Sequence, residues 1–367
     1  MRRLPVLAGL LVVATACGDD GSSPAADTAG ADAGVTDAAG ADALVDDVGG
    51  SDAGSTDADV AVDDASTDAA GDAAGDANDP PPTGPDLVVV TFNIKGDDSL
   101  GSAFDEATSW NYAIDDEDDR RDRVVATLDR LAGDLVCLQE ARPGPVEYML
   151  AGAAIPYAHH GEERGGENAP SDMNGLLYRT DRLTLVDGGH FWLSDTPDEA
   201  GTTFEARDDD NSRMASWAKF EDALGGQQFT ALCTHWSLDS GARQNAARLI
   251  RDRLLALGSA DAPTLVLGDL NATEGDREVR ILRGEEDPDG DLYVDAYRAV
   301  VPDRASDERT YHAFEGITDG SRIDFVLHDD AFVATDAIID RWRTDRGYPS
   351  DHYPVRVVLE WAESTGD

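Results

Sequence analysis

The chain has 367 residues, of which 41% are hydrophobic, and a formal net charge of −46 at pH 7 from 75 acidic and 29 basic side chains. This charge argues against a broad nucleic-acid-binding surface, because sequence-independent binding depends on neutralising phosphates with Lys and Arg. Residues 87–367 are long enough for one large domain with a substantial core, or for two small ones.

The first 17 residues predict an export signal. Arg2 and Arg3 precede an apolar stretch, residues 4–16, which has the length of a signal-peptide core and is short for a membrane span. The stretch ends in Ala14-Thr15-Ala16-Cys17, which resembles a bacterial lipobox with Ala14 where Leu is usual. We therefore expect Cys17 to be lipidated, giving an exported, membrane-anchored lipoprotein in the periplasm or at the cell surface. Ordinary secretory cleavage is the alternative.

The composition of residues 18–86 predicts a disordered acidic linker. The segment contains eighteen Asp and no Lys, Arg or Glu, and the rest is mostly Ala, Gly, Ser and Thr. With so few large apolar residues it cannot bury enough surface to fold, and its like charges repel and extend it. We expect it to hold a folded domain, residues 87–367, away from a membrane.

Residues 87–367 show the patterns of mixed strands and helices in one α/β domain. Apolar residues at helical spacing run through residues 120–131 and again through 242–257, where Gly258 follows as a stop signal. Short apolar runs between the helices predict strands. In chain order, the expected strands are 88–93, 134–140, 175–178, 183–193, 215–220, 229–235, 263–268, 323–328, 332–339 and 354–361, and the other expected helices are 145–151 and 276–282.

Polar residues suited to catalysis stand where these apolar runs stop. Asp269 and Asn271 are the most informative, because residues two apart at a strand end point to the same side, at the sheet rim where catalytic residues tend to lie. Taken singly, an Asn or Asp at a strand end is more often a turn former. Six such features in order argue for one shared site. They are Asn93, Glu140, His235, Asp269 with Asn271, Asp324, and Asp351 with His352.

These features resemble the endonuclease/exonuclease/phosphatase superfamily over residues 87–361. The motifs that carry the resemblance are Thr91-Phe92-Asn93-Ile94, Leu138-Gln139-Glu140, Gly268-Asp269-Leu270-Asn271, Arg322-Ile323-Asp324 and Ser350-Asp351-His352. Residues 189–197 and 310–316 are similar, in addition, to a bacterial subgroup whose substrate is generally unassigned. The resemblance implies a DNase I-like layered sandwich, with two packed β-sheets flanked by helices.

The resemblance also implies a metal-dependent hydrolase acting on phosphoester bonds. The expected cofactor is Mg²⁺, with Mn²⁺ as the alternative, because hard oxygen ligands suit both ions. Glu140 is expected to be the principal metal ligand, with Asn93 and Asp351 completing or orienting the site.

The remaining motif residues are expected to act on the substrate, again by resemblance. Asp269 would orient or deprotonate the attacking water, and Asn271 would hold that water or a phosphoryl oxygen. His352 would lie against the phosphoryl group, with its tautomer or charge fixed by Asp324. The other expected contacts to phosphoryl oxygens or to substrate are His235, Tyr178, Arg213 and His312.

Two pairs of residues are assigned no catalytic role. Cys137 and Cys233 lie inside apolar strands, and we expect two buried thiols, because free Cys behaves as a small buried hydrophobe. A disulfide is the alternative that an oxidising compartment would permit. His159 and His160 lack the spacing of metal ligands and are expected in an exposed loop. Residues 287–291 predict an acidic turn, because the following residues fail the EF-hand pattern.

The expected function is hydrolysis of phosphodiester bonds, nuclease-like, with phosphomonoester hydrolysis as a variant. Arg2, Arg3 and the linker account for −16 of the net charge, which leaves −30 for residues 87–367. A small or compact phosphoester fits that charge more easily than long duplex DNA. Candidate substrates are a nucleic acid, a lipid headgroup or a small phosphoester, and no protein partner is expected. The alternative is a non-catalytic acidic surface lipoprotein that binds cations or a partner.

Overall fold

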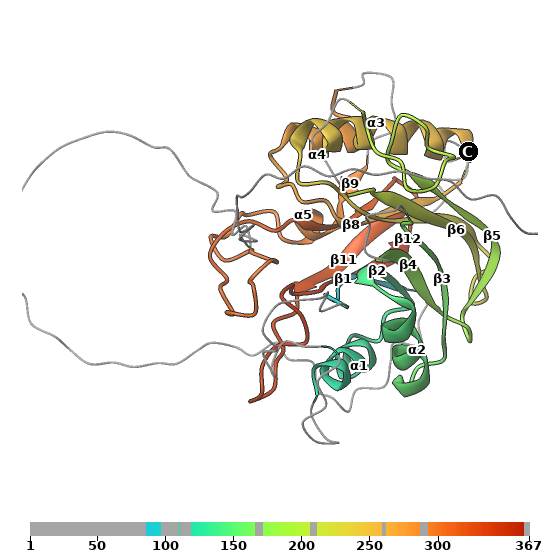
Figure 1. The fold of residues 1–367 in the computed structure, drawn as a ribbon. Coiled ribbons are helices and arrows are strands. Elements are labelled where there is room, and N and C mark those ends of the chain that lie inside the picture. The colour runs from blue at the N-terminus through green and yellow to red at the C-terminus, as the bar shows by residue number, and fades with distance from the viewer. Residues whose placement is uncertain are drawn as a thin grey trace, which may run out of the picture. The chain divides into compact units, whose positions relative to one another are not determined.

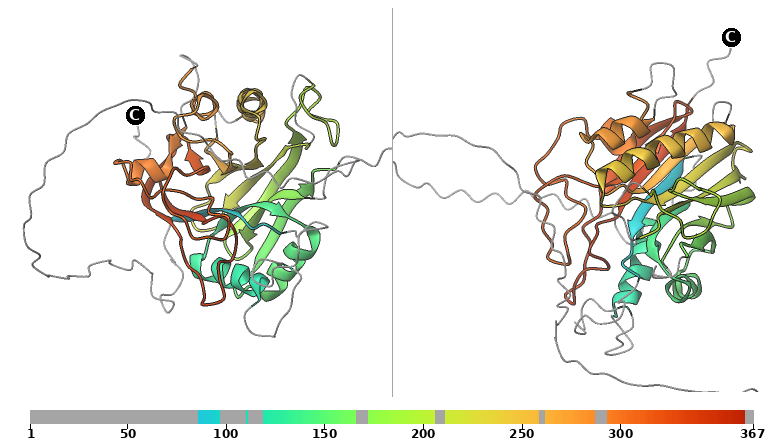
Figure 2. Two further views of the ribbon diagram at one scale, coloured as in Figure 1. Left: turned by 60° about the vertical axis from the view of Figure 1, so that its left-hand side comes forward. Right: turned by 45° about the horizontal axis from the view of Figure 1, so that its top comes forward.

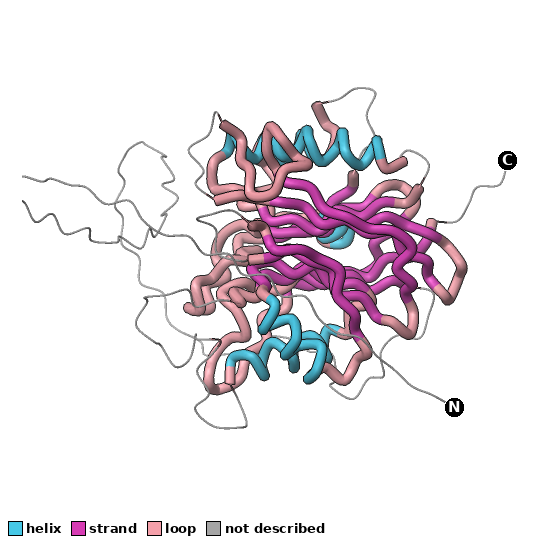
Figure 3. The backbone as a smooth tube through the Cα atoms, turned by 45° about the vertical axis from the view of Figure 1, so that its right-hand side comes forward, coloured by secondary structure: helices cyan, strands magenta, loops and turns pink. Residues whose placement is uncertain are grey.

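The computed structural model describes residues 86–96, 110, 119–165, 172–205, 211–258, 262–286 and 293–362. Two six-stranded β-sheets pack face to face, and helices cover their outer faces (Figures 1 and 3). The predicted layered α/β sandwich is therefore confirmed. Among the helices in these ranges, none is long and apolar enough to cross a membrane.

The first sheet has the strand order β11-β12-β1-β2-β4-β3, and β1 and β2 at its centre are parallel. All its other neighbouring strands are antiparallel. Its strands are β1 (Leu87–Asn93), β2 (Leu135–Ala141), β3 (Tyr157–Glu163), β4 (Met173–Arg179), β11 (Phe332–Ile339) and β12 (Val355–Trp361).

The second sheet has the order β5-β6-β7-β8-β10-β9, and β7 and β8 at its centre are parallel. Each sheet therefore brings the carboxyl ends of two parallel strands to one edge. Its strands are β5 (Leu183–Trp192), β6 (Met214–Asp222), β7 (Gln228–His235), β8 (Thr264–Asp269), β9 (Val294–Asp295) and β10 (Asp324–His328).

Alternation along the central strands divides the apolar residues between three core layers. In β1, Leu87 and Val89 face the layer between the sheets, whereas Val90 and Phe92 face the helices outside. The inner layer also takes Leu265 and Leu267 of β8. Successive side chains of a strand point to opposite faces. The later residues of each strand that share the alternation of these inward-facing residues therefore also point inward, and their side chains lie where the inner layer ends.

The helices lie in two pairs on opposite outer faces (Figures 1 and 2). Asp239 caps the helix that begins at Ser240, because its side chain accepts a hydrogen bond from the Ala242 backbone N–H at 2.7 Å. Gly258 follows the end of the same helix with φ +85°. A fifth, shorter helix is α5 (Ala296–Val300), which packs on β11. The first pair is α1 (Arg120–Leu131) and α2 (Pro143–Gly152), and the second is α3 (Ser240–Ala256) and α4 (Arg277–Leu282).

The expectation of two free thiols is wrong. Cys137 on β2 and Cys233 on β7 form a disulfide within the inner core layer, with 5.3 Å between their Cα atoms. Both belong to the inward rows of their strands, so the packing of the two sheets places them opposite each other.

The expected exposed loop at His159 and His160 is also wrong, because both lie in β3 and are partly buried. His160 Nε2 lies 3.0 Å from the carbonyl oxygen of Trp217 in the second sheet. The expected strands and helices were otherwise found, with β3, β9 and α5 in addition. The expected signal peptide, Cys17, the linker up to residue 85 and the acidic turn at 287–291 lie outside the described residues.

Candidate active site

The strand register brings most of the expected residues into one row at the end of the inner core layer. In the second sheet, His235 pairs with Asp269, and Asp269 pairs with Asp324 across adjacent strands. Asn93 ends β1 in the facing sheet, and its Nδ2 donates to Asp269 Oδ2 at 3.1 Å. The site is therefore the polar end of the space between the sheets, built by both of them.

Asp269 stands at the centre of this row. Its Oδ2 lies 3.6 Å from His235 Nε2 and 3.7 Å from His352 Nε2, and its Oδ1 accepts the Asn271 amide hydrogen at 2.9 Å. Burial raises the pKa of Asp269, and the nearby Asp324 carboxylate adds to this effect, bringing it to about 7. A carboxyl group with such a pKa can take a proton near neutral pH.

His352 is held between two carboxylates. Its Nδ1 lies 3.0 Å from Asp324 Oδ2, while Nε2 faces Asp269. Burial alone would lower the pKa of His352, but the charges of Asp324 and Asp269 outweigh it and raise the pKa to about 10. The imidazole is therefore protonated at neutral pH, and it presents a positive charge to whatever binds beside Asp269.

His235 is a neutral imidazole by contrast. Burial lowers its pKa well below the usual value, and the guanidinium groups of Arg213 and Arg164 lower it further. Asn271 takes the left-handed backbone conformation, with φ +46°, and its Nδ2 donates to the Trp236 carbonyl at 3.0 Å. Asn271 thus joins the segment after β8 to the segment that follows His235.

Glu140 reaches the site through an irregularity in β2. The register of β2 against β4 shifts between Leu138 and Ala141, and Glu140 has φ +51°. Its carboxylate accepts a hydrogen bond from Asn93 Nδ2 at 3.1 Å and pairs with Lys95 Nζ at 3.1 Å. Burial disfavours its charge, but Lys95, the hydrogen bond from Asn93 and the charge of His352 together outweigh burial and lower the pKa of Glu140 to about 2.

Asp351 lies near Glu140 and is 8% exposed. Burial raises its pKa, the His352 charge opposes this, and the Glu140 charge reinforces it. Ser350 Oγ lies 3.2 Å from Asp351 Oδ1 and donates to the Asn93 carbonyl at 2.6 Å. The loop that carries Asp351 is therefore bonded directly to the end of β1.

The residues present fit a hard divalent cation on the Glu140 side of the site. The carboxylates of Glu140, which is partly buried, and Asp351, which is buried, lie near each other and favour a positive charge between them, and carboxylate oxygens suit Mg²⁺ or Mn²⁺. A second group, Asp269, Asp324 and His352, has ligand atoms within 4.8 Å of one another. Because His352 is protonated and bonded to Asp324, that group is better suited to holding protons than to holding a metal.

The structure corrects the expectation for Tyr178. β4 runs antiparallel to β2, so Tyr178 pairs with Leu135 at the far end of the sheet, where its ring packs against Phe220 at 5.1 Å. The residue on the same face of β4 at the site end is Asn174. It is buried, and its Nδ2 donates to the Met214 carbonyl at 3.0 Å.

Sequence reasoning missed Lys95, and the structure places His312 beside Asp351, whose carbonyl oxygen accepts the His312 backbone N–H at 2.7 Å. Lys95 follows the Asn93 motif directly and was not singled out, although an ammonium two residues after a strand-end Asn is a detectable signal. His312, expected to contact substrate, is 1% exposed and stacks on Tyr353 with ring centroids 3.9 Å apart.

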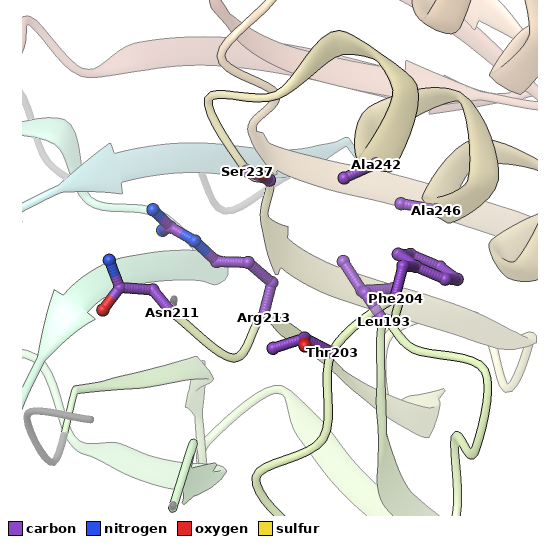
Figure 4. A pocket seen from close by; sticks show the side chains of 8 residues that line it. All are labelled: Leu193, Thr203, Phe204, Asn211, Arg213, Ser237, Ala242 and Ala246. Atoms are coloured by element: carbon purple, nitrogen blue, oxygen red, sulfur yellow. The ribbon is translucent and has the colours of Figure 1, made fainter. Parts of the chain in front are cut away.

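A small pocket adjoins the site on the side of Arg213. In Figure 4 the guanidinium of Arg213 extends away from Phe204 toward Asn211, so the Phe204 side of the pocket is apolar and its Arg213 side is polar. Arg213 lines this pocket and its charge also lowers the pKa of His235, so the pocket lies near the central row. The lining residues are Leu193, Thr203, Phe204, Asn211, Arg213, Ser237, Ala242 and Ala246.

Comparisons with known proteins identify a family and solved structures of the same fold. The model of the endonuclease/exonuclease/phosphatase family matches residues 90–352. A family member from Bacteroides vulgatus is 28% identical, with a TM-score of 0.63, over 76% of this chain and 99% of that one.

Two further solved structures share the fold. A family member from Bacteroides thetaiotaomicron is 22% identical, with a TM-score of 0.66, over 77% of this chain and 97% of that one. A mannosyl-6-phosphatase from the same organism is 23% identical, with a TM-score of 0.64, over 75% of this chain and 100% of that one. The search of curated proteins finds no match.

Proposed function

Because the chain belongs to the endonuclease/exonuclease/phosphatase family, we propose that residues 87–367 hydrolyse phosphoester bonds with a divalent metal ion. The observation that carries the proposal is the placement of Asp269 between protonated His352 and neutral His235, beside the carboxylates of Glu140 and Asp351. A base, a fixed positive charge and a cation site thus meet at one end of the core.

Glu140, Asp351 and Asn93 are the residues that would hold Mg²⁺, with Mn²⁺ as the alternative. When bound, the metal polarises the phosphoryl group and stabilises charge on the leaving oxygen. Lys95 supplies a positive charge to Glu140 at 3.1 Å, which keeps that carboxylate ionised and ready for a cation.

Asp269 would orient the attacking water and accept its proton, since its pKa of about 7 suits a general base at neutral pH. Protonated His352 would donate to one phosphoryl oxygen and neutral His235 to another. Asp324 keeps the charge on His352. Asn271 would fix the segment after β8 beside the attacking water, because its side chain donates a hydrogen bond to the Trp236 carbonyl.

For the substrate we propose a phosphodiester, because the motifs predict a nuclease-like function. A small phosphomonoester is the second candidate, and the −30 charge of residues 87–367 favours it, because a highly acidic surface repels a long polyanion. The mannosyl-6-phosphatase with the same fold acts, by its name, on such a monoester.

We also propose that the protein is exported and anchored by a lipid on Cys17, with residues 18–86 as a tether. The Cys137–Cys233 disulfide supports export, because disulfides persist in oxidising compartments and are rare in the cytosol. The lipid anchor can be checked by mass spectrometry of the membrane fraction, comparing wild type with Cys17→Ala.

The proposed activity is tested with the purified protein on a panel of phosphoesters. The panel holds single- and double-stranded DNA, RNA, sphingomyelin, inositol phosphates, mannose 6-phosphate and bis-p-nitrophenyl phosphate, each with Mg²⁺, Mn²⁺ or EDTA. We expect turnover of at least one compound, abolished by EDTA and restored by the metal. No turnover of any compound by folded protein would favour the non-catalytic, cation-binding lipoprotein instead.

Substituting Asp324 is expected to change the pH dependence of this activity. His352 must be protonated to act, and Asp324, together with Asp269, raises its pKa to about 10 against the effect of burial, so wild-type activity should persist until the pH approaches that value. In Asp324→Asn the pKa falls toward its ordinary value of about 6.5, so the alkaline decline moves to lower pH. The measurement is kcat against pH for both proteins. Superimposable alkaline limbs would contradict the role assigned to Asp324.

A further inference from the structure

Arg120 occupies a position that two local rules disfavour. It is the first residue of α1, where the helix dipole favours negative rather than positive charge. It is also 1% exposed, and a buried charge is costly unless it is well hydrogen-bonded. Departures from such rules tend to mark functional positions.

The guanidinium of Arg120 donates to backbone carbonyls of two segments far apart in sequence. Nη1 donates to the Ile94 carbonyl at 2.8 Å and to the Pro349 carbonyl at 3.2 Å, while Nη2 donates to the Lys95 carbonyl at 2.6 Å. Its Cζ also lies 5.3 Å from the ring centroid of Trp110. Arg120 thus bonds the turn after β1 to the loop before β12.

The turn after β1 is bonded to the end of β2 as well. The Ile94 amide donates to the Gln139 carbonyl at 3.1 Å, and the Gly96 amide donates to the Glu140 carbonyl at 2.9 Å. Lys95 within this turn has φ +48°, a conformation that persists only where surrounding contacts fix it. Three segments therefore meet at a turn whose carbonyls face Arg120.

Each of these three segments carries one of the residues assigned to the metal. Asn93 precedes the turn, Glu140 is the residue before the last of β2, and Asp351 follows Pro349 by two residues. We propose that Arg120 is a positioning residue, which holds these three segments at the spacing that the metal needs. The inference rests on the proposed metal-dependent function and adds to it a residue that touches neither metal nor substrate.

The chemistry of the side chain explains why Arg is needed here. A planar guanidinium presents several N–H donors in fixed directions, so it can serve carbonyls from two segments at once. A Lys ammonium keeps the charge, but it is a compact donor at the end of a flexible stem and lacks this fork. Arg120→Lys therefore keeps the positive charge of the residue but removes the geometry of its N–H donors, so it tests the donor geometry alone.

The test is Mn²⁺ binding to the purified protein, with free Mn²⁺ measured by electron paramagnetic resonance. Loss of a group that orients metal ligands typically costs ~10- to 100-fold in metal affinity, and we expect Arg120→Lys to weaken Mn²⁺ binding by about that factor. Hydrogen exchange should accelerate at residues 94–96 and 348–351 in the same variant, because the bonds that join these segments are lost.

Leu128→Ala is the matched control, because Leu128 is 1% exposed on the same helix and faces the core layer under α1. This variant should lower the melting temperature while it keeps wild-type Mn²⁺ affinity. Folded Arg120→Lys with wild-type Mn²⁺ affinity would overturn the role of Arg120 and leave the metal site standing. Failure of the wild type itself to bind Mn²⁺ would instead overturn the metal site, and the inference with it.

Discussion

Asp269→Asn is expected to lower kcat by roughly 10²- to 10⁴-fold on whichever substrate the protein turns over, the range attributed to a positioned general base. An amide cannot accept the proton of the attacking water, although it has nearly the same shape. In the wild type, Asp269 Oδ1 accepts a hydrogen bond from the Asn271 backbone N–H at 2.9 Å. The oxygen of the introduced amide can accept the same hydrogen bond in the variant. We therefore expect an unchanged fold, measured by circular dichroism, and an unchanged KM for the substrate, measured by steady-state kinetics.

The same substitution should not destabilise the protein. The pKa of Asp269 is raised to about 7, chiefly by burial and then by Asp324, whereas an unfolded Asp titrates near 3.9. Between these values the folded protein binds a proton that the unfolded chain has released, so the free energy of unfolding falls as pH rises through this window. Asp269→Asn lacks this group, and its free energy of unfolding should fall less between pH 4 and pH 7.

Asp134→Asn is the matched control for Asp269→Asn. Asp134 is also buried, but it lies at the other end of β2, where it pairs with Arg182 at 2.6 Å and Arg179 at 3.1 Å. Removing one partner of a buried ion pair costs about 3–5 kcal/mol, so this variant should be less stable yet keep its kcat. If Asp269→Asn kept wild-type kcat while folded, Asp269 would not be the base.

The candidate site could be predicted to a large extent because most of its residues stand at one end of an apolar strand. Side chains alternate between the two faces of a strand, so the apolar pattern predicts the face on which the side chain at the strand end lies. The order of the motifs along the chain identifies which strand carries each residue. His235, Asp269 and Asp324 do pair across adjacent strands as this reasoning requires. Asn93, from the facing sheet, donates to Asp269.

Strand direction and loop conformation could not be predicted in the same way. Tyr178 was assigned to the site by resemblance, but β4 is antiparallel to β2, so the start of β4 lies at the site and Asn174 stands there. Glu140 and Lys95 both have positive φ, and single-residue backbone turns of this kind leave little trace in a sequence. The approach of Lys95 to Glu140 depends on those turns.

The disulfide illustrates a second limit, because it joins strands of different sheets. The apolar surroundings of Cys137 and Cys233 predicted burial correctly, since both are 0% exposed. Their distance depends on how the two sheets are packed, which no local pattern contains. Gln139 stands next along the inward row of β2 after Cys137 and donates to Thr91 Oγ1 at 3.1 Å, so the disulfide lies directly beneath the residues of the site.

Removing the disulfide is expected to lower the free energy of unfolding by roughly 2–5 kcal/mol, the usual range for a native disulfide. The bond closes a loop with a sequence separation of 96, and closing a loop of about 100 residues restricts the unfolded chain by about 4.7 kcal/mol in the chain-entropy model. The measurement is urea unfolding of Cys137→Ala, Cys233→Ala and the double variant, without reductant. Ala is chosen because both positions are fully buried and a hydroxyl would lack a partner.

The three variants distinguish a disulfide from two independent thiols. If the bond is present, either single substitution already breaks it, so the second adds little and the losses are strongly non-additive. Two buried thiols would give losses that each reflect a small cavity and that sum more nearly in the double variant. Thiol titration of the unfolded, unreduced wild type provides a second readout, since a reagent that detected both Cys137 and Cys233 would contradict the bond. Because the disulfide joins β2 to β7 beneath the site, its loss should also speed hydrogen exchange at the ends of both strands, where Glu140 and His235 stand.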